Sequence, residues 1–280
     1  MRPFWALIRK EVHESRWTLV LSTLALFGLG WLFVYVTSLN EAEIVRQLGS
    51  DSGDIGGRIR FLRSLGIEEE PRSVALIMAS WNHPFILIVI SVWAIGRGSG
   101  AVAAEIERGT LDLILSRPVA RWVYLTAHIC VAVAGLAILG LALMGGAAMA
   151  LRYNVLRQPP GAWTLLQPAI NLAALGLPIY GYTLLASAVD HVRRRPASVG
   201  AVLTLAGFIA WVIALIPVLR DTWWRPWLER VSIFKAYNPV ELVTKGQTLG
   251  VNLAILGSLG AACITLAFLA FALRDLPANG

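Results

Sequence analysis

The 280-residue sequence is poor in charged residues and in cysteine. Only 15% of its residues are Asp, Glu, Lys or Arg, against about 25% in soluble domains. Apolar residues make up 57%, and the mean hydropathy is +0.66. A water-soluble domain of this size has too little interior to bury that much apolar surface. Lipid must therefore be the solvent for much of the chain.

The chain also lacks the motifs of common catalytic sites. Its three lysines do not follow glycine as a nucleotide-binding phosphate loop requires; they are Lys10, Lys235 and Lys245. His13 and Glu14 begin like a zinc-protease motif, but Trp17 stands where the second histidine belongs. No serine has the glycine spacing of a hydrolase nucleophile. We therefore expect no cofactor, no metal and no enzymatic activity in this chain.

The net charge and the two cysteines indicate no function beyond insertion into a membrane. Cys130 and Cys263 fall inside apolar stretches, which predicts small buried residues. The net charge is +7. No basic stripe with interleaved aromatic residues is present, so we expect no nucleic-acid partner. Arginines at the membrane edges that meet anionic headgroups explain the charge, and the lipid bilayer is the expected partner.

Six stretches are long enough to cross a bilayer, which takes about 20 apolar residues. The second holds Asn82, His83 and Pro84 near its start, and the fourth holds Asn171 and Pro178. The first apolar run is too long for a signal-peptide core. The sequence thus predicts an all-α membrane protein, one domain over 1–280, with spans at 18–39, 80–103, 122–150, 169–189, 197–219 and 247–273.

Residues 1–17 have a helical pattern. Phe4, Leu7, Ile8 and Val12 share one face, interrupted by Glu11, and charged residues take the other. This pattern is typical of an amphipathic helix lying in the membrane interface; the alternative is a solvated extension of the first span. Six spans put both termini on one side. Tight basic clusters beside span ends favour the cytoplasmic side of an inner membrane.

The stretch EIERGTLDLILSRPVAR, residues 105–121, interrupts the apolar chain between the second and third spans. Thr110 is a suitable N-cap, Asp112 suits the first turn, and Pro118 ends a helix over 110–117. This helix is roughly 10 Å long, too short to span, and is apolar all round. It predicts either a helix seated in another protein or a re-entrant turn buried in its own bundle.

This stretch resembles the cytoplasmic motif after the second span in ABC transporter permeases of the second type. Ile114 stands where leucine is usual, and Asn238-Pro239 resembles the Asn-Pro element before the last span of that family. The matching residues are Glu105, Glu107, Gly109, Thr110, Leu111, Ile114, Leu115, Ser116, Pro118, Val119 and Arg121. All of these except Val119, together with Arg108, are the expected ATPase-coupling residues.

The resemblance implies the membrane subunit of an exporter. In that family two copies of the permease pair with two copies of a separate ATPase, and the helix at 110–117 is a coupling helix seated in the ATPase. The substrate is not implied. Two alternatives stay open: a membrane component that serves the maturation or assembly of another protein, and an intramembrane enzyme. The enzyme is disfavoured because no pair of catalytic groups lies at one depth.

Three further sites have two interpretations each. The inner loop between the fourth and fifth spans is either a second ATPase contact or a positive-inside signal; its residues are Asp190, Arg193, Arg194 and Arg195. Arg97 either snorkels to the interface, or it contacts an acidic substrate on a pathway or a partner carboxylate. His128 is either functional, as ionisable groups buried in lipid often are, or a satisfied structural histidine, which we expect. Gly96 and Gly100 suit close helix packing. In the outer segment 40–73, the piece RIRFLRSLGI predicts a short surface helix.

Overall fold

The computed structural model describes residues 2–49, 72–111, 120–154, 156, 159–216, 222–244 and 248–274. These residues are helical and contain no strand, which confirms the all-α fold. The helices are α1 (Arg2–Gly49), α3 (Arg72–Ser80), α4 (Pro84–Gly100), α5 (Ala103–Glu107), α7 (Arg121–Tyr153), α8 (Ala162–Val189), α9 (Arg194–Leu215), α10 (Arg225–Val231), the 3-10 turn η2 (Ile233–Ala236), α11 (Pro239–Thr244) and α12 (Leu249–Leu273).

Five of these helices, α1, α7, α8, α9 and α12, are long and apolar enough to cross a membrane. The pair α3 and α4 forms a sixth span if it is counted as one, because the two are bent by 41° at a short break. Pro84 opens α4, and His83 accepts a hydrogen bond from the backbone N–H of Phe85. The Asn-His-Pro sequence thus breaks the second predicted span near its start. The chain is a multi-pass membrane protein.

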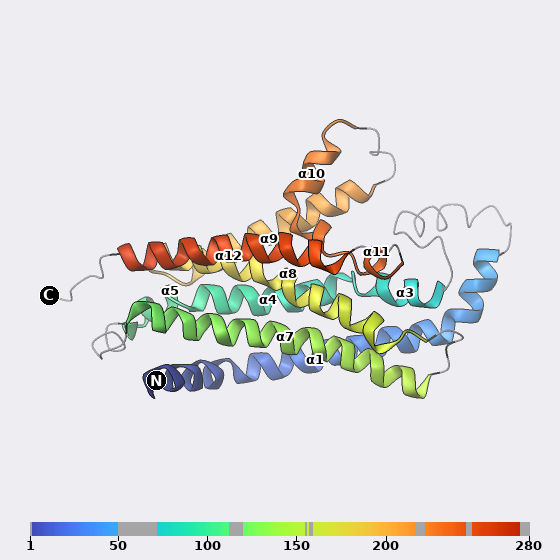
Figure 1. Cartoon of the computed structure of the whole chain (residues 1–280), viewed down its shortest axis with the longest axis horizontal. Coiled ribbons are helices and arrows are strands. Elements are labelled where there is room, and N and C mark those ends of the chain that lie inside the picture. Colours follow the sequence, from blue (N-terminus) through green and yellow to red (C-terminus); the bar gives the residue numbers. More distant parts are fainter. Residues whose placement is uncertain are drawn as a thin grey trace.

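The long helices lie side by side, and different short helices lie at the two opposite ends of the bundle (Figure 1). The short helix α5, the start of α1 and the end of α12 lie at one end, which we call the proximal end. The short elements α3, α10 and α11 lie toward the other, the distal end. The stretch resembling a coupling motif therefore begins at the proximal end.

The N-terminal segment differs from the expected separate interfacial helix. One unbroken helix runs from Arg2 to Gly49 and packs lengthwise against α7. Close approach is possible because a Cβ on Gly146 of α7 would overlap the carbonyl oxygen of Phe27, and one on Gly30 of α1 would overlap that of Leu143. Residues 2–17 are thus continuous with the first span. Their position at the membrane interface stays a prediction.

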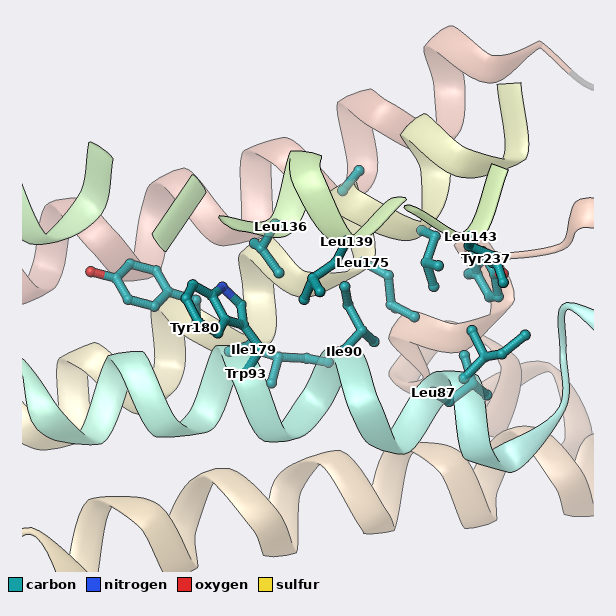
Figure 2. Packing of buried hydrophobic residues seen from close by; sticks show 14 of the residues in the cluster. Leu87, Ile90, Trp93, Leu136, Leu139, Leu143, Leu175, Ile179, Tyr180 and Tyr237 are labelled. Carbon is teal, nitrogen blue, oxygen red and sulfur yellow. The ribbon is translucent and has the colours of Figure 1, made fainter. Parts of the chain in front are cut away.

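The core lies where α4, α7 and α8 meet. Figure 2 shows Trp93 of α4 among leucines of α7 and beside Ile179 of α8. The indole Nε1 of Trp93 donates to the carbonyl oxygen of Ala132, at 3.3 Å. A buried indole N–H needs such a partner. The hydrogen bond therefore fixes the position of the bulkiest core side chain as well as the α4–α7 contact.

Two predictions about small residues are wrong. Gly96 and Gly100 have open space where a Cβ would project, whereas a Cβ on Gly98 would lie 2.8 Å from the Cβ of Thr183 in α8. The close packing was thus assigned to the wrong glycines. Cys130 is exposed on α7, and Cys263 is half-buried. Apolar cysteines on lipid-facing helices need not be buried within the chain.

At the distal end the segment between α9 and α12 is fastened to the bundle. Asn171 of α8 donates to the carbonyl oxygen of Ala236, and the Tyr237 hydroxyl donates to that of Trp81, both at 3.1 Å. In the Asn-Pro element, Asn238 accepts a hydrogen bond from the N–H of Glu241. The element therefore starts the short helix α11. Of the predicted surface helix at 40–73, residues 50–71 lie outside the described residues.

Candidate functional site

The first part of the coupling stretch is a tight structure organised by one buried carboxylate. Glu105 of α5 is 2% exposed. Lys10 of α1 donates to it at 3.0 Å, and the Thr110 hydroxyl donates at 2.6 Å. Arg108 lies 3.6 Å away. A buried carboxylate is stable only with such charged and hydrogen-bonding partners, so Glu105 fixes the stretch against α1.

A left-handed glycine ends α5. Gly109 has φ +68°, the one positive φ among the residues that the structure describes. Its N–H donates to the carbonyl oxygen of Ile106, and the N–H of Thr110 donates to that of Glu105. Glycine has little steric cost in this conformation. Gly109 thus turns the chain away from α5 so that Thr110 reaches Glu105.

Leu111, the first apolar residue of the expected coupling helix, is 2% exposed and belongs to the core of the bundle. It agrees with the alternative interpretation, a turn buried in its own bundle, and does not face outward in this chain. Ile114, Leu115, Ser116, Pro118 and Val119 lie outside the described residues. The coupling helix itself therefore stays a prediction.

Ser187 holds the break between α4 and α5 against α8. Its hydroxyl donates to the carbonyl oxygen of Ser99 at 3.1 Å and accepts from the N–H groups of Val102 and Ala103 at 3.2 and 2.9 Å. These groups would otherwise lack partners at the helix ends. The fully buried Ser187 thus supplies the hydrogen bonds that the backbone lacks between the end of α4 and the start of α5.

The two loops predicted to lie on the inner side, one after α4 and one before α9, meet at the proximal end, and we keep the name inner loops for them. A carboxylate oxygen of Glu107 accepts a hydrogen bond from the backbone N–H of Arg193, at 2.9 Å. Within the second loop, Asp190 accepts from the N–H groups of His191 and Val192. Slight desolvation opposes these bonds, but together they lower the pKa of Asp190. Asp190 therefore stays ionised and shapes the turn before α9.

The arginines of the second loop remain exposed. Arg193, Arg194 and Arg195 all face outward, and the Arg195 guanidinium lies 3.7 Å from Asp190. An exposed ion pair of this length contributes little to stability. These side chains are therefore available to a partner, as the sequence analysis expected of a contact surface, and their role as an ATPase contact stays a prediction.

Arg121, the last residue of the motif, has a structural role that the sequence analysis missed. Its Nη1 donates to the carbonyl oxygens of Phe271, Ala272 and Arg274, at 3.2, 3.1 and 2.8 Å. Arg274 in turn donates to the carbonyl oxygens of Ala188 and Asp190. Each cation caps a helix C-terminus, where unpaired carbonyls and the helix dipole favour positive charge.

A buried ionic cluster lies between α1, α4 and α7, next to the coupling stretch. Glu11 is 1% exposed and pairs with Arg97 of α4. Nδ1 of His128 in α7 lies 3.2 Å from Glu11, but without hydrogen-bond geometry, so both ring nitrogens lack a hydrogen-bond partner among the described residues. Isolated charges at this depth are costly. The Glu11–Arg97 pair therefore joins α1 to α4 inside the bundle.

This cluster lines a pocket of about 510 Å³ between the start of α1, the end of α4 and α5. Glu105 and Arg108 line it as well, as does Arg193. The pocket thus brings together Arg97, the coupling stretch and the second inner loop, which the sequence analysis had singled out separately.

One prediction about this cluster is wrong, because His128 is buried but not satisfied by hydrogen bonds. Arg97 pairs with Glu11 inside the bundle, and its place relative to the membrane interface stays a prediction. The missed residue is Glu11, a carboxylate on the apolar face of the N-terminal helix. A charge on a face otherwise made for burial was the available signal, because it requires a buried cation as partner.

Comparison with known proteins extends this local agreement to the whole chain. No curated protein matches the sequence. Residues 5–276 match the family model described as ABC-2 family transporter protein, which spans all the described helices except the first few residues of α1. The chain therefore belongs to the ABC-2 family of transporter proteins.

Proposed function

We propose that this chain is the membrane-spanning permease subunit of an ATP-driven exporter, and that residues 105–121 contact a separate ATPase subunit. The observation that carries the proposal is the fixed position of this stretch. Glu105 binds Lys10 and Thr110, and Glu107 binds the backbone of the second inner loop. Such ties would transmit a push on the stretch to the bundle.

The motif residues divide into two groups in this proposal. Glu105, Thr110, Leu111 and Arg121 hold the stretch within the chain, because each is engaged with the chain's own residues. Glu107, Arg108 and Gly109 are exposed. With Ile114 and Leu115 they supply the contact surface, and charged residues around an apolar seat set orientation and specificity.

The second inner loop completes the surface. Arg193, Arg194 and Arg195 are exposed beside Glu107, so one partner can touch both loops. The proposed complex has two copies of this permease and two of the ATPase, with the proximal end in the cytoplasm of a cell with an inner membrane. Closure of the ATPase pair moves both loops, and rigid-body motion of the spans switches access across the membrane.

Arg97 and the pocket around it lie on the proposed substrate pathway. The pocket holds three carboxylates and three guanidinium groups besides His128. Ionisable residues inside a membrane domain line substrate or ion paths when they face a cavity. A displacement of α5 would reach this pocket directly, since Glu105 and Arg108 line it.

The test is co-purification of the permease with its ATPase. Replacing Ile114 and Leu115 by Asp is expected to abolish the complex while the permease still elutes as a folded protein. Leu111 is unsuitable because it is buried, and its replacement would unfold the bundle. The matched control is Val231→Asp, an exposed apolar residue of α10 at the distal end.

The proposal fails if the doubly substituted permease still binds the ATPase. Transport itself is tested in vesicles that contain the complex, by ATP-dependent movement of a substrate that stimulates ATP hydrolysis. A complex that hydrolyses ATP but moves no compound in a broad screen would instead indicate the maturation or assembly function.

A further inference from the structure

A second polar pocket lies at the distal end, far from the coupling stretch. It has a volume of about 690 Å³ and lies between α10, η2 and the first turns of α12. Figure 1 shows α10 projecting from the bundle above α12. The pocket is lined by Glu229, Arg230, Ser232, Lys235, Ala236, Thr248, Val251, Asn252 and Ile255.

The charges around this pocket favour an anion. Arg230 and Lys235 line it together with one acid, Glu229. That carboxylate is already paired, with Lys235 on one side and Arg225 at 3.0 Å on the other. Two cations thus pair with one carboxylate, and Arg230 adds a third positive charge beside them, so the local net charge is positive. A small anion would neutralise the positive charge that Glu229 alone does not neutralise.

The start of α12 adds backbone donors. Thr248 is the N-cap but makes no side-chain cap bond, and no acid lies in the first turn. The N-terminal N–H groups of a helix need outside acceptors, and the dipole of a 25-residue helix favours a negative group there. The pocket opens at this end of α12.

Asn252 provides an independent sign of a ligand. It lines the pocket in the first turn of α12, is only 6% exposed, and its amide Nδ2 is buried with no hydrogen-bond partner among the described residues. A buried, unpaired amide donor is costly and is rare in folded proteins. An acceptor oxygen in the pocket would satisfy it.

The pocket continues into an apolar stripe. Val251, Ile255 and Leu259 follow one another at four-residue intervals on α12 and are 56%, 51% and 41% exposed. Trp223 and Trp227, before and within α10, are also exposed, and exposed aromatic side chains are typical of the headgroup level of a bilayer. The polar pocket suits the headgroup of a lipid, and the apolar stripe beside it suits an acyl chain.

We propose that this pocket binds one anionic phospholipid of the distal leaflet. Its phosphate lies at the start of α12, near Arg230, Lys235 and the Asn252 amide, and one acyl chain follows Val251, Ile255 and Leu259. A soluble phosphate would use the polar part of the pocket alone. We favour the lipid because the apolar stripe begins inside the pocket, where Val251 and Ile255 are among its lining residues.

The experiment uses the full chain in nanodiscs of equal parts phosphatidylglycerol and phosphatidylcholine. Lipids that remain bound after transfer to detergent are measured by native mass spectrometry. The wild type is expected to retain phosphatidylglycerol in preference to phosphatidylcholine. Replacing both Arg230 and Lys235 by Gln is expected to reduce that preference about tenfold, given the attraction of each basic residue for anionic lipid. Arg152→Gln, an exposed cation at the end of α7, is the matched control.

Asn252→Leu tests the amide separately. It keeps both cations but removes the unpaired donor, so retention of both lipids should fall while the preference between them persists. The proposal is overturned if the wild type shows no preference, or if the double variant keeps it. Displacement of phosphatidylglycerol by soluble glycerol phosphate would also overturn it, because the site would then hold a soluble anion.

Discussion

Glu107, which ends α5, accepts a hydrogen bond from the backbone N–H of Arg193, 86 positions later in the chain. The contact joins the two inner loops at the proximal end of the bundle. Because the acceptor is a side chain and the donor is backbone, the position of the second loop depends on Glu107 whatever side chain residue 193 carries.

Replacing Glu107 by Ala is therefore expected to free the Arg193 amide. Hydrogen exchange at that amide should become faster, while Glu107→Gln, whose amide oxygen still accepts, should keep most of the protection. Thermal stability should change little, since the group is exposed. Equal exchange in the wild type and the Ala variant would show that the contact does not hold the loop.

Gly109→Ala is expected to lower the free energy of unfolding by about 1 kcal/mol, because an L side chain is strained at φ +68°. The measurement is thermal unfolding in detergent. The control is Gly257→Ala in the interior of α12, where a Cβ meets nothing within 4 Å and alanine favours the helix. A Gly109 variant as stable as the control would contradict the assigned turn.

Gly146→Ala is expected to separate α1 from α7, because the new methyl group would overlap the backbone of Phe27. Overpacking of this kind costs about 2 kcal/mol. The effect is read from the midpoint of unfolding, compared again with Gly257→Ala. An unchanged midpoint would mean that α1 does not pack against α7 as closely as described.

Glu11 and Arg97 should be strongly coupled. Glu11→Leu leaves a buried guanidinium without its carboxylate, at a cost of about 3 kcal/mol. The double variant Glu11→Leu with Arg97→Met removes both charges and is expected to recover most of that loss. The measurement is a double-mutant cycle of unfolding free energies. Additive effects of the two single changes would show that the residues do not pair.

Glu229 should make stability depend on pH at the distal end. A hydrogen bond from Lys235 is the main reason that its pKa is lowered, with Arg225 contributing. A carboxylate with a lowered pKa in the folded state stabilises above its unfolded pKa of about 4.3, and this contribution is lost as pH falls through the folded value. The stability advantage over Glu229→Gln should therefore shrink on acidification below about pH 4.3. A constant difference would contradict the lowered pKa.

The sequence predicted the membrane spans well because each needs only a long apolar run. Two predicted spans were irregular. The one that contains Asn82, His83 and Pro84 is broken into α3 and α4, whereas the one with Asn171 and Pro178 is the unbroken helix α8. The family motif was recognisable because Gly109 and Thr110 have fixed roles in a turn. Local chemistry of this kind is visible in a single sequence.

Contacts between distant segments were not predictable in the same way. Nothing in the sequence states that Glu11 and Arg97 meet, or that Ser187 completes the break after α4. Gly98 and Gly96 look alike in a sequence, and only the neighbour across the interface decides which one must lack a side chain. These features depend on how helices are rotated about their axes, which apolar patterns fix poorly in a chain surrounded by lipid.

The arginine caps give the proximal end a mechanical property. Arg121 donates hydrogen bonds to the terminal carbonyl oxygens of α12, and Arg274 donates to those of α8. These hydrogen bonds join α7, α12 and α8 to one another at the proximal end. A displacement applied where α7 begins is therefore expected to move these three helices together.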